Sequence, residues 1–363
     1  MIALRCTVVL ISTLLAGCGA PEKDTATAGA SAHAAEQIRW KLVTAWPKSM
    51  PVLGTTPVRF AEMIGAMSNG RLEISVYGAG ELVPAFGVFD AVSQGTAQMG
   101  YGASYYWRGK IPIAQIFTTV PFGMTAQETN AWLHYGGGLE LWREVYAPHG
   151  LIPFPGGNSG VQMAGWFNRE IRSVADLKGL KMRIPGLAGE VLQRAGGVAV
   201  NIPGGELFTS LQTGVIDATE WVGPYNDLAL GFYDITKYYY YPGWHEPGGT
   251  TEIIANKSAF EGLPADLQAI VEVATRAVNQ DMLDEYTARS NAALKVLVEE
   301  HGVQLRELPP DVIARFKEIS NEVLKEAAAT DALSKRVYDS YMAFYHDVAA
   351  YHRITEQAIL DMR

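Results

Sequence analysis

The chain has 363 residues, of which 48% are hydrophobic and 18% are charged, and its formal net charge is -9. This length allows two lobes of ordinary domain size, and the absence of a Lys/Arg-rich run argues against a nucleic-acid-binding protein. The acidic balance does not exclude an anionic ligand, because one buried Arg can hold a carboxylate whatever the surface charge.

The N-terminus has the pattern of a bacterial export signal. Arg5 precedes the apolar run CTVVLISTLLA, which is too short for a membrane span. The run ends in Leu-Ala-Gly-Cys at residues 15–18, which resembles the lipobox of bacterial lipoproteins. This pattern predicts that Cys18 is lipidated and becomes the first mature residue. The alternative is an ordinary signal that is cut at a small-residue site further along, for instance in the ASAHAA stretch.

The cysteines and the composition after the signal fit a periplasmic protein with a tether. Cys6 and Cys18 are the only cysteines, so the folded body has neither a disulfide nor a cysteine metal site. Residues 19–37 are rich in Ala, Thr and Ser and lack an apolar period. We therefore interpret residues 1–18 as a lipoprotein signal peptide, residues 19–37 as a flexible tether, and the periplasm as the destination, with the protein anchored to a membrane through lipid.

Strand-like and helix-like segments alternate over residues 38–157. This alternation predicts a parallel sheet covered by helices, in an N-terminal α/β lobe that residues 250–263 complete. Strands are predicted at 38–46, 71–78, 98–104 and 151–154, and helices at 56–70, 88–94 and 132–145.

A second series of the same character occupies residues 158–249, and it includes a capping box at Ser173 to Asp176. Two α/β series in tandem predict two lobes with a cleft between them. Ligands of open α/β sheets bind outside the carboxyl ends of strands, so we expect the functional residues at those ends.

The last part of the chain, residues 264–363, is predicted to be helical and to pack across both lobes. Apolar residues recur at a helical period from Pro264 to about His301. At about 1.5 Å per residue this helix exceeds 50 Å, more than one lobe needs. It therefore either bridges the two lobes or packs between two protomers of a homodimer. A final helical region begins near Pro309.

Two charged residues occupy expected strand ends. Arg183 lies in the otherwise apolar segment KMRIP, where a buried guanidinium needs an anionic partner. That partner is either a ligand carboxylate, held by two parallel hydrogen bonds, or an acidic residue of the protein. Glu220 directly precedes Trp221 in DATEWVGPYND, where a carboxylate is either an ion-pair partner or a ligand for a cation.

A third set of residues indicates a cation site. Glu246 lies in WHEPGG, where Pro and Gly would fix its direction, and with Glu220 and the side-chain amide of Gln162 it would form an all-oxygen site. Such a site suits a hard cation such as sodium or calcium. His245 would suggest zinc, but no other His is near in sequence and no cysteine is available. Tyr105, Tyr106 and Trp107 form an aromatic cluster that suits either a ligand wall or core packing.

Five segments in register carry a family resemblance. They are AVSQGTAQMGYGASYYWRGK, FTTVPFGMT, GNSGVQMAGWFNREI, DLKGLKMRIPG and DATEWVGPYND. In this order they resemble the solute receptors of TRAP (tripartite ATP-independent periplasmic) transporters, over nearly all of residues 38–345. The resemblance is closest to the branch that binds 2-oxo acids such as pyruvate, or lactate-like 2-hydroxy acids, together with a metal cation.

The resemblance implies a two-lobed fold of the periplasmic-binding-protein kind that closes on its ligand and delivers it to the small and large membrane subunits of a permease. It implies that Arg183 clamps the ligand carboxylate. It also implies a cation ligand set and further ligand-facing residues. The cation ligands would be Gln162, Glu220, the Trp221 carbonyl and Glu246, of which Gln162, Trp221 and Glu246 also face the ligand, as do Asn158 and Tyr106.

Two other classes of function compete with the receptor. In a secreted hydrolase or lyase, Glu220 and Glu246 would act as an acid/base pair and the aromatic residues would stack on a sugar. No nucleophile elbow is visible, and Arg183 favours a small anion over a neutral sugar. A sensory lipoprotein would bind the same ligand without a transporter. We therefore predict a receptor rather than an enzyme.

Overall fold

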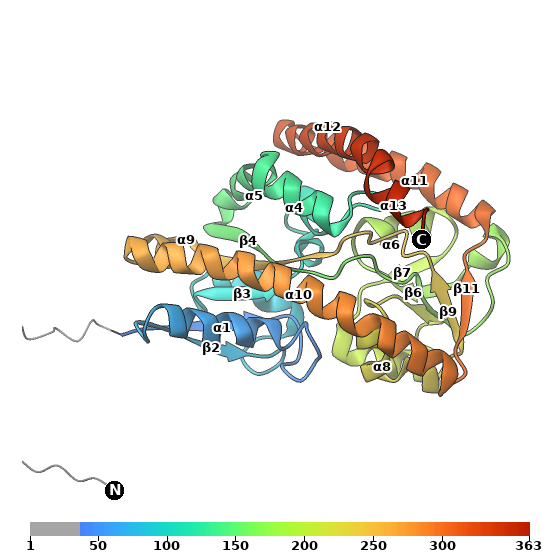
Figure 1. Cartoon of the computed structure of the whole chain (residues 1–363), viewed down its shortest axis with the longest axis horizontal. Coiled ribbons are helices and arrows are strands. Elements are labelled where there is room, and N and C mark those ends of the chain that lie inside the picture. The colour runs from blue at the N-terminus through green and yellow to red at the C-terminus, as the bar shows by residue number, and fades with distance from the viewer. Residues whose placement is uncertain (1–36) are drawn as a thin grey trace, which may run out of the picture. The chain divides into compact units, whose positions relative to one another are not determined.

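Two β-sheets organise residues 37–363, which are the residues that the structure, a computed structural model, describes. The expected signal at 1–18, with Cys18, and residues 19–36 of the expected tether lie outside these described residues. Figure 1 shows the sheets side by side, each covered by helices, with helix α10 running past both. The predicted α/β architecture with long C-terminal helices is confirmed.

The first sheet has five strands in the order β2-β1-β3-β10-β4. Strand β1 is parallel to β2 and β3, whereas β10 is antiparallel to β3 and to β4. A register shift between Thr251 and Glu252 marks a bulge in β10. The strands are β1 Ile38–Thr44, β2 Leu72–Tyr77, β3 Met99–Gly102, β4 Leu151–Asn158 and β10 Thr250–Asn256.

The second sheet has six strands in the order β11-β9-β5-β8-β6-β7. Strand β6 is parallel to β7 and β8, and β9 is parallel to β11, whereas β5 is antiparallel to β8 and β9. The strands are β5 Gly165–Phe167, β6 Lys181–Arg183, β7 Val198–Val200, β8 Ala218–Thr219, β9 Tyr238–Tyr241 and β11 Gln304–Glu307.

The expectation of a parallel sheet is wrong in part, because the chain passes from one lobe to the other and back. Strand β10 follows strands β5 to β9 of the second sheet but joins the first, between β3 and β4. A local βαβ connection forces neighbouring strands to be parallel, whereas a strand that returns from the other lobe is free to run the opposite way. Both sheets are consequently mixed.

The helices of the two lobes are short, and a much longer one links them. Helix α10, Ala265–Glu299, has 35 residues, which at about 1.5 Å per residue is roughly 50 Å. It contacts α1 and β4 of the first lobe and α8 of the second, so it bridges both lobes. The shorter helices are α1 Thr56–Met67, α2 Val88–Ser93, α3 Gln115–Thr118, α4 Ala126–Tyr135, α5 Gly138–Tyr146, α6 Gly186–Arg194, α7 Leu207–Gln212, α8 Pro224–Leu230 and α9 Lys257–Glu261.

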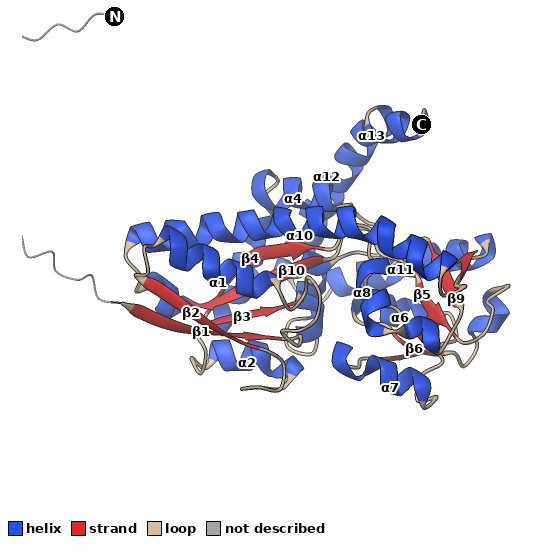
Figure 2. Ribbon diagram, turned by 60° about the horizontal axis from the view of Figure 1, so that its bottom comes forward, coloured by secondary structure: helices blue, strands red, loops and turns tan. Residues whose placement is uncertain are grey.

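The C-terminal helical region consists of three helices, α11 Pro310–Ala328, α12 Ala332–Ile354 and α13 Glu356–Leu360. Helix α11 contacts α6 of the second lobe, and α12 contacts α4 and α5 of the first. Figure 2 shows α12 and α13 leading away from the two sheets. Within residues 37–363, no helix has both the length and the apolar character needed to span a bilayer.

Candidate functional site

A buried cavity lies where strand ends of the two sheets meet α10. Its walls include Ala103 and Thr250 from the first lobe, Arg183 and Trp221 from the second, and Met282 from α10. The free volume is about 20 Å³, which is room for about one water molecule. A larger ligand therefore needs a movement of the lobes or of the side chains that fill the cavity.

Arg183 reaches this cavity from the end of β6. The register places it beside Thr219, the last residue of β8. Because Glu220 directly follows Thr219, Arg183 and Glu220 lie at the same carboxyl edge of the sheet. Its Nε donates to the Ile202 carbonyl at 3.2 Å, its Nη1 to the Glu220 carbonyl at 3.3 Å and its Nη2 to the Tyr106 hydroxyl at 3.4 Å. The guanidinium is thus fixed on several sides.

Glu220 forms a buried ion pair with Arg183. Its Oε1 accepts from Nη1 of the arginine, and its Oε2 lies 3.3 Å from Nε2 of His245. Burial lowers the pKa of the Arg183 guanidinium, but the charge of Glu220, together with smaller contributions from Tyr106, Tyr105 and Glu246, outweighs burial, so the pKa is raised. Of the two partners that the sequence left open for Arg183, the structure shows the protein carboxylate.

Glu246 and Gln162 come together from two segments that connect the lobes. Gln162 lies between β4 and β5, and Glu246 between β9 and β10. Nε2 of Gln162 donates to Oε2 of Glu246 at 2.7 Å and to the Ser159 hydroxyl at 3.0 Å. Burial, reinforced by the charge of Glu220, raises the pKa of Glu246 well above its usual value, and Arg183 opposes this rise.

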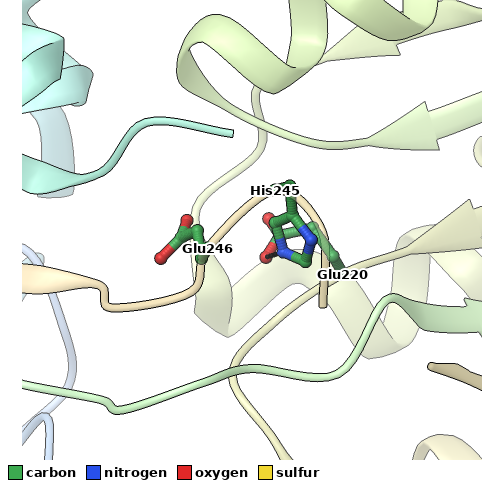
Figure 3. Close-up of side chains that lie close together, drawn as sticks. All are labelled: Glu220, His245 and Glu246. Carbon is green, nitrogen blue, oxygen red and sulfur yellow. Dashed lines mark hydrogen bonds and ion pairs between the residues drawn. The ribbon is translucent and has the colours of Figure 1, made fainter. Parts of the chain in front are cut away.

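The carboxylates and the amide offer an oxygen-rich cation site. Glu220, His245 and Glu246 each place one donor atom within 4.8 Å of the others, and Figure 3 shows these three side chains gathered together. Oε1 of Gln162 is buried and has no hydrogen-bond partner among residues 37–363. Carboxylate and amide oxygens are the ligands that sodium- or calcium-like hard cations take. The donor set therefore fits such an ion.

His245 suits a supporting role better than a metal-ligand role. Its Nε2 faces Glu220, while its buried Nδ1 has no hydrogen-bond partner in the described part of the chain. A metal-bound histidine normally donates its other N–H to a carboxylate, carbonyl or water. A tautomer that carries its proton on Nε2 and donates it to Glu220 avoids a buried, unpaired N–H.

Aromatic side chains complete the wall around Arg183. The centre of its guanidinium lies 4.9 Å from the ring centroid of Trp221, and Tyr106 accepts its hydrogen bond. Gly204 allows the Trp221 ring to lie there, because a Cβ at residue 204 would come within 2.1 Å of that ring. Tyr105 also lines the cavity and packs edge-on against Tyr106, with ring centroids 4.8 Å apart.

Asn158 does not line the cavity. Its Nδ2 donates to the Thr250 hydroxyl at 3.0 Å, and its Oδ1 accepts from the backbone N–H of Gly160 at 2.9 Å. Both ends of the amide are therefore used within the protein. The structure brings Arg183, Gln162, Tyr106, Trp221, Glu220 and Glu246 together, and it places Asn158 behind the wall.

Several further residues at the site were not predicted as site residues, among them Tyr105, Ser159, His245 and Met282. Tyr105 and Ser159 are sequence neighbours of predicted residues, and His245 was considered only as a zinc ligand. Met282 reaches the cavity from α10. Its spacing in the sequence is that of any buried helix position, so no local signal distinguishes it.

Comparison with known families finds one match over most of the chain. The family described as bacterial extracellular solute-binding protein, family 7, matches residues 42–331. The chain is 44% identical, over 320 residues, to the monocarboxylate 2-oxoacid-binding periplasmic protein of Nostoc sp.. This alignment covers 88% of the chain and 87% of that relative.

Two solved structures are similar over nearly their whole length. One is a TRAP periplasmic solute-binding protein from Pseudoalteromonas atlantica with bound sodium and pyruvate, at 45% identity and a TM-score of 0.87, covering 90% of this chain and 99% of the other. The second, from Colwellia psychrerythraea with bound calcium and pyruvate, has 45% identity and a TM-score of 0.88, covering 90% and 100%. The two-lobed periplasmic-binding-protein fold is therefore confirmed.

Proposed function

We propose a ligand and a cation for this chain, which belongs to the bacterial extracellular solute-binding proteins of family 7, the solute receptors of TRAP transporters. The ligand is pyruvate or a closely related 2-oxo or 2-hydroxy monocarboxylate, and it binds together with sodium or calcium. One observation carries the proposal: a buried guanidinium and a cluster of oxygen donors face the same cavity. Such a cavity recognises an anion and a cation at once.

Arg183 would hold the ligand carboxylate. Its guanidinium is planar and positively charged, which suits two parallel hydrogen bonds to a carboxylate. Tyr106 and Trp221 contact that guanidinium and would restrict where the carboxylate lies. In this structure the guanidinium is ion-paired with Glu220, so the ligand carboxylate must compete with a carboxylate of the protein. Such competition lowers affinity unless something else binds Glu220.

The cation would resolve that competition. Gln162 would provide its unpaired Oε1, Glu220 and Glu246 their carboxylates, and Trp221 its carbonyl oxygen. A cation that binds Glu220 replaces Arg183 as its counter-charge and releases the guanidinium for the ligand. The same ion would polarise the 2-oxo or 2-hydroxy oxygen of the ligand. Ligand and cation therefore favour each other's binding.

The interpretation as a secreted hydrolase or lyase is not supported. The family consists of solute receptors that work with membrane permease subunits, and the similar structures are solute-binding proteins. Glu220, the supposed acid or base, is instead ion-paired with Arg183. The chain is thus a receptor rather than an enzyme, and it acts in the periplasm.

We further propose that Cys18 carries a lipid anchor and that α10 forms part of a homodimer. Mass spectrometry of the mature N-terminus tests the lipid anchor. A Cys18→Ala variant that still sediments with the membrane fraction would contradict the anchor.

Sedimentation equilibrium tests whether the protein is a homodimer. We also propose a division into a lobe of residues 38–157 with 250–263, a lobe of residues 158–249, and residues 264–363, which are helical apart from strand β11 of the second sheet.

Thermal unfolding of the mature receptor tests the ligand proposal. The protein, stripped of ligand and metal, is heated with small carboxylates or sugars, each with and without sodium or calcium. A ligand that binds the folded state raises the unfolding midpoint by mass action. We expect a large rise with pyruvate that depends on the cation. A rise with sugars alone, or consumption of the added compound, would contradict the proposal.

A further inference from the structure

One side-chain hydrogen bond joins the two lobes beside the cavity. Asn226 lies in α8 of the second lobe, and its Nδ2 donates at 2.8 Å to the carbonyl of Pro51, in the loop between β1 and α1 of the first lobe. Its side chain is fully buried. The Pro51 carbonyl also accepts from the N–H of Leu53, so loss of the Asn226 bond removes one of its two donors and leaves the buried amide N–H without that partner.

The orientation of the Asn226 amide is determined by its two partners. The Pro51 carbonyl can only accept, so Nδ2 must face it, and the Oδ1 then accepts from the hydroxyl of Tyr286 in α10. Helix α8 packs against α10, as Figures 1 and 2 both show. Tyr286 therefore holds the amide from the side of the second lobe and aims its N–H across the cleft.

The acceptor of this bond lies in a strained turn. The N–H of Leu53 donates to the Pro51 carbonyl at 2.7 Å, which closes a three-residue γ-turn around Val52. Val52 has a φ of 60°, in the left-handed region that β-branched residues rarely adopt. Strain of this kind persists where surrounding contacts impose it, and it is found at ligand clamps. Asn226 is one such contact.

Both partners adjoin cavity walls. Leu53, which ends the strained turn, lines the cavity, and so do Trp221 and Val222, which precede α8. We propose that Asn226 is a latch: its hydrogen bond to Pro51 forms when the lobes close on the ligand and slows ligand release. This role rests on the proposed function as a receptor that closes around a small carboxylate.

Another bond between the lobes, besides that of Arg183 to Tyr106, makes a useful contrast. Arg108, in the first lobe, donates to the carbonyl of Gly186 in the second at 3.2 Å. Arg108 is exposed, so water satisfies both groups when the lobes separate. Asn226, unlike Arg108, has a fully buried side chain, so water competes less for its hydrogen bond, and we take it as the stronger determinant of closure.

The isosteric variant Asn226→Asp isolates the donor. Aspartate keeps an oxygen for the Tyr286 hydroxyl but loses the N–H and places a carboxylate against the Pro51 carbonyl. From the usual value of a buried hydrogen bond, we expect pyruvate to leave at least about 10 times faster in the presence of calcium, with little change in the association rate. Asn226→Ala, which also loses the Tyr286 bond, should release pyruvate faster as well.

The matched control is Asn256→Ala. Asn256 bonds to the Val92 carbonyl and to the N–H of Ala259, both in the first lobe, so its loss should lower stability without changing the release rate. Stopped-flow tryptophan fluorescence gives the rates. Thermal unfolding without pyruvate gives a second readout, in which Asn226→Asp should resemble the wild type if the latch forms only on closure.

The outcomes separate the latch from the proposed function. Unchanged release of pyruvate in both Asn226 variants would overturn the latch while the wild type still binds pyruvate with calcium. Faster release accompanied by an equal slowing of association would indicate a general distortion of the site and also overturn it. Failure of the wild type to bind pyruvate with either cation would overturn the proposed function and the latch together.

Discussion

The guanidinium of Arg183 and the carboxylate of Glu220 form an ion pair across neighbouring strand ends, with 1% and 0% of their side chains exposed. A buried pair of this kind is costly to form and more costly to break, because removing one partner strands the other charge. The two residues that we assign to ligand and cation thus depend on each other. A ligand carboxylate can replace Glu220 as the partner of Arg183, while a cation that binds with it replaces Arg183 as the counter-charge of Glu220.

Arg183→Met should abolish pyruvate binding and also destabilise the fold. It leaves Glu220 buried without its counter-charge, which typically costs about 3–5 kcal/mol. The double variant Arg183→Met/Glu220→Gln should recover much of that loss without recovering binding. Urea unfolding and calorimetry of the single and double variants test this. Equal stability of both variants would contradict the claim that Arg183→Met is destabilising because it leaves the Glu220 charge unpaired.

Glu220→Gln should remove the dependence of pyruvate binding on the cation. The amide keeps the shape of the side chain but not the charge that a cation requires, so calcium affinity falls and pyruvate binds about equally with and without calcium. Glu252→Gln is the matched control, because Glu252 is buried outside the cavity and bonds to Ser104, Trp107 and Tyr146. Calcium-dependent pyruvate binding that survives Glu220→Gln would remove Glu220 from the cation site.

Gly204→Ala should weaken pyruvate binding without removing any polar group. The added Cβ would meet the Trp221 ring at 2.1 Å, so the ring must move relative to Arg183. Gly205→Ala is the control, because its Cβ would meet only Pro47, at 3.7 Å. We expect about a tenfold loss of affinity for the first variant, from the few kcal/mol that overpacking costs, and little for the second. Equal affinities would indicate that Trp221 tolerates displacement.

Glu252 should make the receptor less stable as the pH rises. Burial raises its pKa from 4.5 to about 7, although Ser104, Trp107 and Tyr146 donate to it. Because the folded-state pKa is the higher one, its contribution to stability is complete below the unfolded value and is lost as the pH passes through about 7. The loss is about 3 kcal/mol at 1.36 kcal/mol per pKa unit.

Glu252→Gln should therefore be more stable than the wild type at pH 8 and similar at pH 5. The amide fits, since its oxygen accepts from Trp107 and its N–H groups can donate to the two hydroxyls. Urea unfolding at both pH values measures this. Asp227→Asn is the contrast, because backbone and indole N–H groups face its two oxygens and an amide cannot satisfy both. A stability difference independent of pH in Glu252→Gln would contradict the account.

The chemistry of the site was predictable where it resides in residue type and motif. An arginine in an apolar strand, a glutamate at a strand end and a glutamate in a Pro/Gly-bounded loop indicated an anion and a cation site, and Arg183, Glu220 and Glu246 do meet. The pairing of Arg183 with Glu220 was left open, because a strand pattern indicates where a side chain leaves the backbone but not which group it bonds to. Asn158 shows the same limit, since its amide turns to Thr250 instead of the cavity.

Contacts between distant segments were beyond the sequence pattern. Periodicity reports the face of an element, which placed β6 and α10 correctly. It does not report that β10 returns to the first sheet in the antiparallel direction, nor that Asn226 reaches Pro51, 175 residues away. Such contacts form where distant segments meet as the two lobes close. A short window of the sequence does not contain both partners.

Isothermal titration calorimetry of pyruvate into the metal-stripped receptor, and into the same receptor with sodium or calcium, tests the central claim most directly. The account predicts one molecule of pyruvate per chain, bound tightly with the cation and weakly without it, and the reciprocal titration must show the same coupling free energy for the cation. Pyruvate affinity that is unchanged by either cation would contradict the shared site of Arg183, Glu220, Gln162 and Glu246.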